Sequence, residues 1–126
     1  MSKTILILIF PLIFASFKLF DAPSSIEWQT ETTHDFGNVK KGEPAEFSFI
    51  FKNVSETPMT VDNVRVSCGC TAPEWDETEV ILPDSTGSIK LVFTSKTGGY
   101  FYKMAKVYFS GQRKAEKLFI EGDVVP

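Results

Sequence analysis

The chain has 126 residues, 43% of them hydrophobic and 13% aromatic, which supplies one compact core and excludes two. Twelve phenylalanines, without long runs of the helix formers Ala, Leu, Glu and Lys, favour sheet over helix. The formal net charge is -3, and the basic residues are scattered rather than gathered in a stripe, which argues against nucleic-acid binding.

The N-terminal segment has the charge order of a secretory signal. Lys3 precedes an apolar run from Ile5 to Phe17. The run is shorter than the roughly 20 residues that cross a bilayer, and Pro11 interrupts it. We predict that residues 1–22 are a signal peptide or hydrophobic anchor. Residues 23–126 are then one exported domain without a membrane span, located in the periplasm, on the cell surface or in the medium.

Short strands separated by turn residues follow in chain order. Between Ala45 and Asn53, Phe47, Phe49 and Phe51 alternate with other residues, so three rings point to one core face. The same period-two pattern, or a short apolar run, predicts strands over residues 26–30, 59–67, 79–82, 86–94, 100–110 and 115–122. Residues 34–39 and 72–75 are predicted as a turn and a loop. About seven such strands indicate an all-β antiparallel two-sheet sandwich, with a barrel as the competing architecture.

Four sequence blocks carry a family resemblance: FGNVKKGE, FSFIFKNVSETPMTVDNVRVSCGCTAPEW, ILPDSTGSIKLVFTSKTGGYF and FIEGDVVP. Over residues 30–125 the chain resembles the bacterial domain-of-unknown-function family numbered 1573. The resemblance implies an Ig-like sandwich related in shape to Hydin-type and major-sperm-protein-type domains, in exported bacterial proteins without established activity. It also implies that Phe36 and Gly37 let the chain cross between sheets, and that Asn53 ends a strand. Gly69 and Thr71 belong to its most specific block.

Cys68-Gly69-Cys70 is the one constellation with evident chemistry. In an exported protein two cysteines usually become oxidised, and so short a ring is easier to reduce than a long-loop disulfide. Three alternatives stay open. The thiols can pack as small hydrophobic groups; they can form half of a copper or zinc site with His34, Met59, Met104 or a second chain; or they can exchange with other thiols.

Other candidates have simpler structural interpretations. His34 and Asp35 suggest general-base chemistry, but neighbours on an extended chain point in opposite directions, so we expect Asp35 to cap backbone amides. Ser67 lacks the Gly-x-Ser-x-Gly frame of a nucleophile elbow. Residues 74–79 lack the carboxylate spacing of a calcium loop. We expect a solvated loop there, with Trp75 folded back on the sandwich.

These observations predict an exported, non-catalytic module that binds a protein or a cell-envelope component, with no cofactor and no enzyme active site. Tyr100, Tyr102 and Tyr108 alternate with Phe101 and Val107, so some aromatic rings are expected to face outward as a contact patch. The alternative is an envelope metal-binding or thiol-redox protein that uses the two cysteines.

Overall fold

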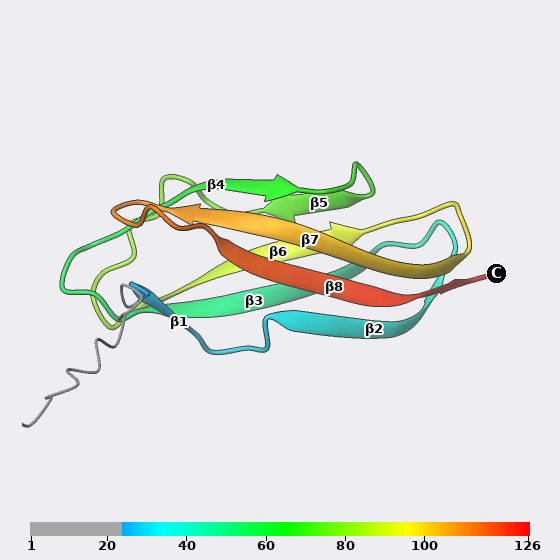
Figure 1. Cartoon of the computed structure of the whole chain (residues 1–126), viewed down its shortest axis with the longest axis horizontal. Coiled ribbons are helices and arrows are strands. Elements are labelled where there is room, and N and C mark those ends of the chain that lie inside the picture. The colour runs from blue at the N-terminus through cyan, green and yellow to red at the C-terminus, as the bar shows by residue number, and fades with distance from the viewer. Residues whose placement is uncertain (1–23) are drawn as a thin grey trace, which may run out of the picture.

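The computed structural model describes residues 24–126, so the predicted signal segment, residues 1–22, lies outside the described part. The described chain forms β1 (Ile26–Trp28), β2 (Thr33–Lys40), β3 (Ala45–Asn53), β4 (Val61–Val66), β5 (Thr71–Glu74), β6 (Thr86–Phe93), β7 (Gly99–Phe109) and β8 (Glu116–Val125). These strands make two four-stranded sheets, β1-β3-β6-β5 and β2-β8-β7-β4, stacked face to face (Figure 1). The predicted two-sheet sandwich is confirmed. Between residues 24 and 126 no helix is long and apolar enough to span a membrane.

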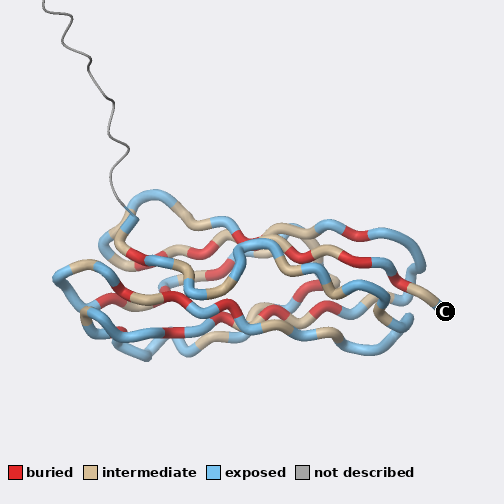
Figure 2. Tube along the Cα trace, turned by 90° about the horizontal axis from the view of Figure 1, so that it is seen from below, coloured by how far each residue is buried: buried red, intermediate tan, exposed pale blue. Residues whose placement is uncertain are grey.

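The core lies between the sheets because each strand turns alternate side chains inward. Phe49 and Phe51 are 0% and 1% exposed, as the alternation predicted. They meet a layer from the other sheet that includes Val107, Leu118 and Ile120, each 0% exposed. Figure 2 shows the resulting alternation of buried and exposed positions along the strands. Burying each large apolar side chain contributes about 1.5–3 kcal/mol, so this layer is the main source of stability.

Asn53 ends β3, as the resemblance implied, and it does so with a buried side chain. Its amide nitrogen donates to the carbonyl oxygens of Thr57 at 2.8 Å and Ile81 at 3.0 Å. Its amide oxygen accepts from the backbone N–H of Ser55 at 2.9 Å and from the Ser55 hydroxyl at 2.6 Å. One buried amide therefore joins the turn after β3 to the segment before β6.

The segment that precedes β3 differs from its prediction. Residues 34–39, predicted as a turn, lie in β2, which runs parallel to β8. The chain changes sheets between β1 and β2, in residues 29–32, so the crossing implied for Phe36 and Gly37 is wrong. Gly37 instead takes a φ of 66° where the register with β8 shifts. It forms a β-bulge, for which glycine is suited because it tolerates positive φ.

Two predictions after the cysteines are also wrong in part. Residues 72–75, predicted as a loop, contain most of β5, which pairs with β6. β5 is an edge strand, where Pro73 costs no ladder hydrogen bond on the open side. Residues 79–82, predicted as a strand, contribute only an isolated bridge between Met59 and Ile81.

Candidate functional site

The two cysteines lie in the loop between β4 and β5. Their Sγ atoms are 2.07 Å apart and their Cα atoms 5.2 Å apart, so they are placed as a bonded pair. The backbone N–H of Cys70 donates to Cys68 Sγ at 3.1 Å. Gly69 is exposed between them, while Thr71, which begins β5, is only 4% exposed. The motif is therefore anchored at its C-terminal end and open at its tip.

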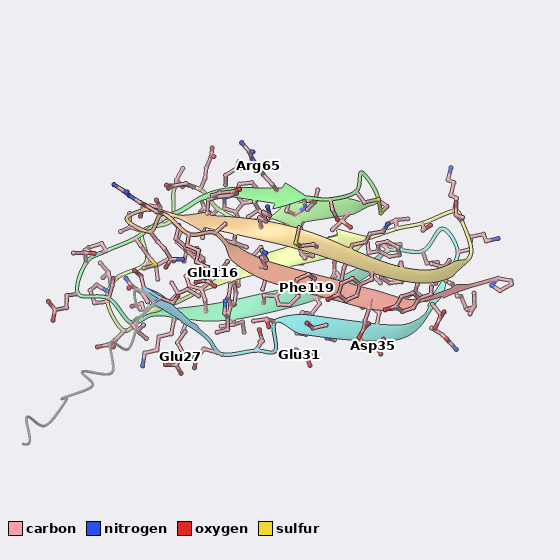
Figure 3. The ribbon with its side chains drawn as sticks, viewed as in Figure 1. Glu27, Glu31, Asp35, Arg65, Glu116 and Phe119 are labelled. Carbon is pink, nitrogen blue, oxygen red and sulfur yellow. A yellow bond between two sulfur atoms is a disulfide. The ribbon has the colours of Figure 1, made fainter. Side chains whose placement is uncertain are left out.

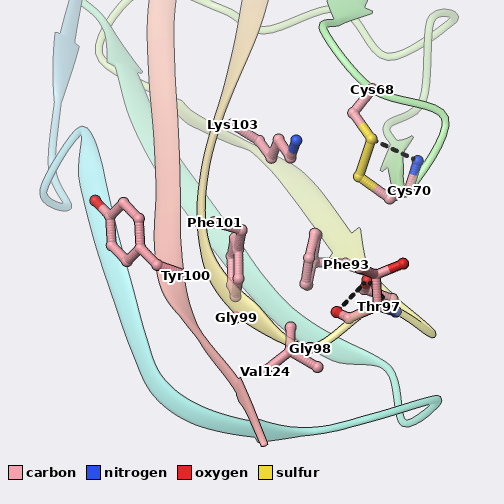
Figure 4. Close-up of a pocket in the computed structure, with 11 residues that line it drawn as sticks. Cys68, Cys70, Phe93, Thr97, Gly98, Gly99, Tyr100, Phe101, Lys103 and Val124 are labelled. Carbon is pink, nitrogen blue, oxygen red and sulfur yellow. Dashed lines mark hydrogen bonds between the residues drawn. A yellow bond between two sulfur atoms is a disulfide. The ribbon is translucent and has the colours of Figure 1, made fainter.

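The cysteine pair forms part of the wall of a pocket of about 310 Å³. Phe93 of β6 and Phe101 of β7 also line it, with their rings stacked at a centroid distance of 3.8 Å. Lys103 lines the same pocket, and Figure 4 shows its ammonium end directed toward the two sulfur atoms. We call this the thiol pocket. Its wall combines the bonded Cys68–Cys70 pair, two aromatic rings and one lysine.

The thiol pocket does not gather the ligands that a metal site needs. His34, Met59 and Met104, the possible further ligands in the metal-site alternative, do not line it. In the part of the chain that the structure describes, no group of three or more His, Cys, Asp or Glu side chains is placed to hold a metal ion. A copper or zinc site at these cysteines would depend on ligands from a second chain.

The side chains of His34 and Asp35 contact different partners. His34 Nδ1 lies 2.7 Å from Glu31 Oε1, and its ring stacks on Phe47 at a centroid distance of 3.7 Å. Asp35 Oδ1 accepts the backbone N–H of Gly37 at 2.8 Å. The predicted capping role of Asp35 is confirmed, and the two residues do not form an acid–base pair.

The acidic loop after β5 is a hydrogen-bonded turn. Trp75 folds back on the sandwich as predicted, and its Nε1–H donates to the carbonyl oxygen of Val61 at 3.1 Å. The Asp76 carboxylate accepts from the hydroxyl and the backbone N–H of Thr78, which holds the pKa of Asp76 below its ordinary value. The Oδ1 atom of Asp76 is thus used within the loop.

The outer face of the β2-β8-β7-β4 sheet carries a cluster of exposed aromatic rings. Tyr100 and Tyr102 are 66% and 51% exposed, so the expected outward position is confirmed for both. Tyr102 stacks on Phe119 of β8 at a centroid distance of 5.3 Å. The Arg65 guanidinium lies 5.6 Å from the centre of the Tyr108 ring. We call this surface the aromatic face; Figure 3 labels Phe119 and Arg65 on it.

Phe119 is the residue of this face that sequence reasoning missed. A single phenylalanine in an apolar strand is typical of the core, and only the register with β7, which places Phe119 opposite Met104, shows that it points outward. Tyr100 is held by its hydroxyl, which donates to Glu121 Oε2 at 2.8 Å. That hydrogen bond, followed by burial and by the charges of Glu121, Tyr102 and Asp35, raises the pKa of Tyr100.

The two stacked four-stranded sheets define an Ig-like β-sandwich domain. Residues 26–124 match the family described as "Protein of unknown function (DUF1573)", and the chain belongs to this family. The resemblance noted in the sequence is confirmed. No curated protein matches the sequence.

Solved structures confirm the fold at low sequence identity. A protein of unknown function from Porphyromonas gingivalis W83 is 13% identical with a TM-score of 0.64; the match covers 79% of this chain and 46% of that one. The ASH / PapD-like domain 7 of human CEP192 is 11% identical with a TM-score of 0.65, covering 99% and 96%. SSP-19, an MSP-domain-like protein of Caenorhabditis elegans, is 7% identical with a TM-score of 0.51, covering 75% and 95%.

Similar folds also occur inside longer chains. The match to the VesB protease of Vibrio cholerae has a TM-score of 0.65 at 13% identity, and covers 79% of this chain but only 32% of the protease. This chain therefore spans less than half of that protein and of the one from P. gingivalis. These likenesses define architecture and leave activity to the site.

Proposed function

We propose that this chain is an exported, non-catalytic module that binds another protein through its aromatic face. The observation that carries the proposal is the exposure of Tyr100 and Tyr102 on one face, with Tyr102 stacked on Phe119. Aromatic residues and arginine are enriched at binding interfaces. Exposed apolar side chains that lie together on a small domain often mark an interaction site, whereas single scattered ones do not.

Two further observations support export and a non-catalytic role. Lys3 and the apolar run after it have the pattern of a secretory signal. The residues that suggested general-base or calcium chemistry are engaged in local hydrogen bonds, as the Asp35–Gly37 and Asp76–Thr78 contacts illustrate. Export is tested by fractionating cells that express the full chain and measuring the mass of the accumulated protein. A full-length protein confined to the cytoplasm would contradict it.

Site-specific photo-crosslinking in the native host tests the binding role. A photoreactive residue at Tyr102 is expected to give a discrete adduct, whereas the same residue at Ile50 is not. Ile50 is the matched control, because it is also an exposed apolar side chain but lies on the other sheet. No adduct from Tyr102, or equal adducts from both positions, would contradict binding through the aromatic face.

The thiol pocket supports a second candidate function, thiol–disulfide exchange with a dithiol substrate. A substrate thiolate attacks Cys70 Sγ and breaks the bond to Cys68 Sγ, which takes the electron pair as a thiolate. The N–H of Cys70 already donates to this sulfur, and Lys103 lines the same pocket with its ammonium end directed toward the sulfur atoms, so both favour the thiolate. The second substrate thiolate then displaces Cys70, so the substrate becomes a disulfide and the Cys68–Cys70 pair takes up two electrons and two protons.

Reduction kinetics with dithiothreitol test this candidate. Lys103→Met is expected to slow reduction of the pair about tenfold, whereas Lys90→Met, on the opposite sheet, leaves the rate unchanged. After brief reduction, iodoacetamide is expected to label Cys68 before Cys70. Equal rates in the two variants, or first labelling of Cys70, would contradict the assignment.

A further inference from the structure

The charges on the aromatic face are sorted into rows. Arg65, Lys106 and Lys117 lie side by side on β4, β7 and β8, because Arg65 pairs with Lys106 and Lys106 pairs with Lys117. We call these three residues the basic row. Like charges directly opposite one another on neighbouring strands destabilise a sheet. Within the described chain none of the three forms an ion pair, so no carboxylate of the same molecule offsets their mutual repulsion.

An acidic row lies on the other side of a central apolar row. Asp35 of β2 pairs with Glu121 of β8, and these two residues form the acidic row. Met104 and Phe119, which pair with each other between the two charged rows, form the apolar row. Outward residues two apart on a strand are about 6.8 Å apart, so each charged row lies about that distance from the apolar row. Figure 3 labels Arg65, Phe119 and Asp35 as one member of each row.

We propose that the partner of the aromatic face is a second copy of this chain, related by a two-fold axis along the apolar row. This inference rests on the proposed binding role of that face. An axis that lies between two stacked sheets and crosses their strands reverses the order of the rows. The basic row of each copy then meets the acidic row of the other on β8, the strand that carries both Lys117 and Glu121. Phe119 and Met104 then meet their own counterparts. An axis along the strands would instead stack basic row on basic row, so the charges select one arrangement.

The same two-fold axis also brings opposite charges together and aromatic rings together. Lys117 lies over Glu121 of the second copy, and the reverse contact follows by symmetry. Tyr100, one row beyond Glu121, lies over Tyr108, one row beyond Lys106, because the rows are ordered on β7. Four strands and five rows cover a footprint of roughly 20 by 27 Å. Since this is below the ~800 Å² per partner of a standard interface, we expect a reversible dimer with a dissociation constant in the micromolar range, about 1–100 μM.

Charge reversal with rescue tests the proposal. The full chain is expressed with residues 1–23, and the form that accumulates is studied by sedimentation velocity and native mass spectrometry. Variant one is Lys106→Glu with Lys117→Glu, and variant two is Glu121→Lys. Each variant alone is expected to weaken dimerisation at least tenfold, because it sets like charges over like charges. A mixture of the two is expected to form a heterodimer, since each then supplies the charge that the other lacks.

The matched control is Lys52→Glu with Lys90→Glu, which reverses two lysines on the opposite sheet and is expected to leave dimerisation unchanged. Rescue in the mixture also excludes misfolding of either variant as the cause of the loss. Three results would overturn the inference: a wild-type monomer up to about 1 mM, dimers indifferent to both variants, or variants that fail to rescue each other. If the Tyr102 crosslink gives an adduct with a different protein, the inference fails while the proposed binding function stands.

Discussion

The two outer faces of the sandwich use the same residue types in opposite ways. On the β1-β3-β6-β5 face, Lys90 lies 2.8 Å from Glu74 and 3.7 Å from Glu46, so its charge is paired on the strands at either side. On the aromatic face, by contrast, the cations and the carboxylates occupy separate rows. One face pairs its charges within the molecule, and the other keeps its cations apart from its carboxylates.

This difference explains why fold alone would not locate the contact surface. Both sheets present the same backbone geometry and rest on the same core. What separates them is the outward set of side chains. Tyr100 and Tyr102 are exposed on one face, whereas Ile50 is the one large apolar side chain that the central strands β3 and β6 expose on the other. Three changes break or sharpen this comparison, in decreasing order of effect.

Removing the shared core should affect both faces equally. Phe49→Ala deletes a fully buried ring and is expected to lower the free energy of unfolding by about 3–5 kcal/mol. Chemical denaturation measures the loss, and amide hydrogen exchange should show that β3 and β8 lose protection together. Loss confined to one sheet would contradict the view that both faces stand on one cooperative core.

Removing an exposed aromatic ring should separate binding from stability. Tyr102→Ser is expected to weaken self-association about tenfold or more. The free energy of unfolding should change by less than about 1.5 kcal/mol, because only the stacking on Phe119 is lost. Ile50→Ser is the control from the other face and should leave association unchanged. An equal effect of both substitutions on association would erase the distinction between the faces.

Removing the paired lysine should have the smallest effect. The hydrogen bond to Glu74, with the charges of Glu46 and Glu74, raises the pKa of Lys90 above its ordinary 10.5. Lys90→Met is expected to lower the melting temperature by no more than about 2 °C. Because the pKa of Lys90 is higher in the folded state, its charge stabilises the fold fully below the ordinary pKa of 10.5. This stabilisation is lost as the pH rises through the pKa of the folded state. The difference in melting temperature between wild type and Lys90→Met should therefore be full at pH 7 and fade above pH 10.5. A difference that grows with pH would contradict the pairing.

Sequence periodicity predicted the elements whose side chains alternate and missed those defined by pairing. The alternation of Phe47, Phe49 and Phe51 predicts β3, because a strand places these three rings on one face, toward the core. β5 could not be found in this way, since Pro73 argues against a strand and only its ladder to β6 creates one. Gly37 signalled a turn, but the structure uses the same backbone freedom for a bulge inside β2.

For the candidate sites, the sequence predicted only the residues that are close to one another in the chain. The spacing of Cys68 and Cys70 indicated thiol chemistry, but the pocket beside them is assembled from β6, β7 and β8, which are distant in sequence. Likewise, the tyrosine alternation indicated an outward face, whereas the charged rows depend on the register between strands. No single-strand pattern contains that register.

Concentration-dependent amide chemical shifts test most directly whether the aromatic face is where this protein meets its second copy. As the protein concentration rises through the micromolar range, the account predicts shift changes at Lys106, Lys117 and Glu121, with β3 and β6 unaffected. Shift changes centred on β3 and β6, or no changes at any concentration, would contradict it.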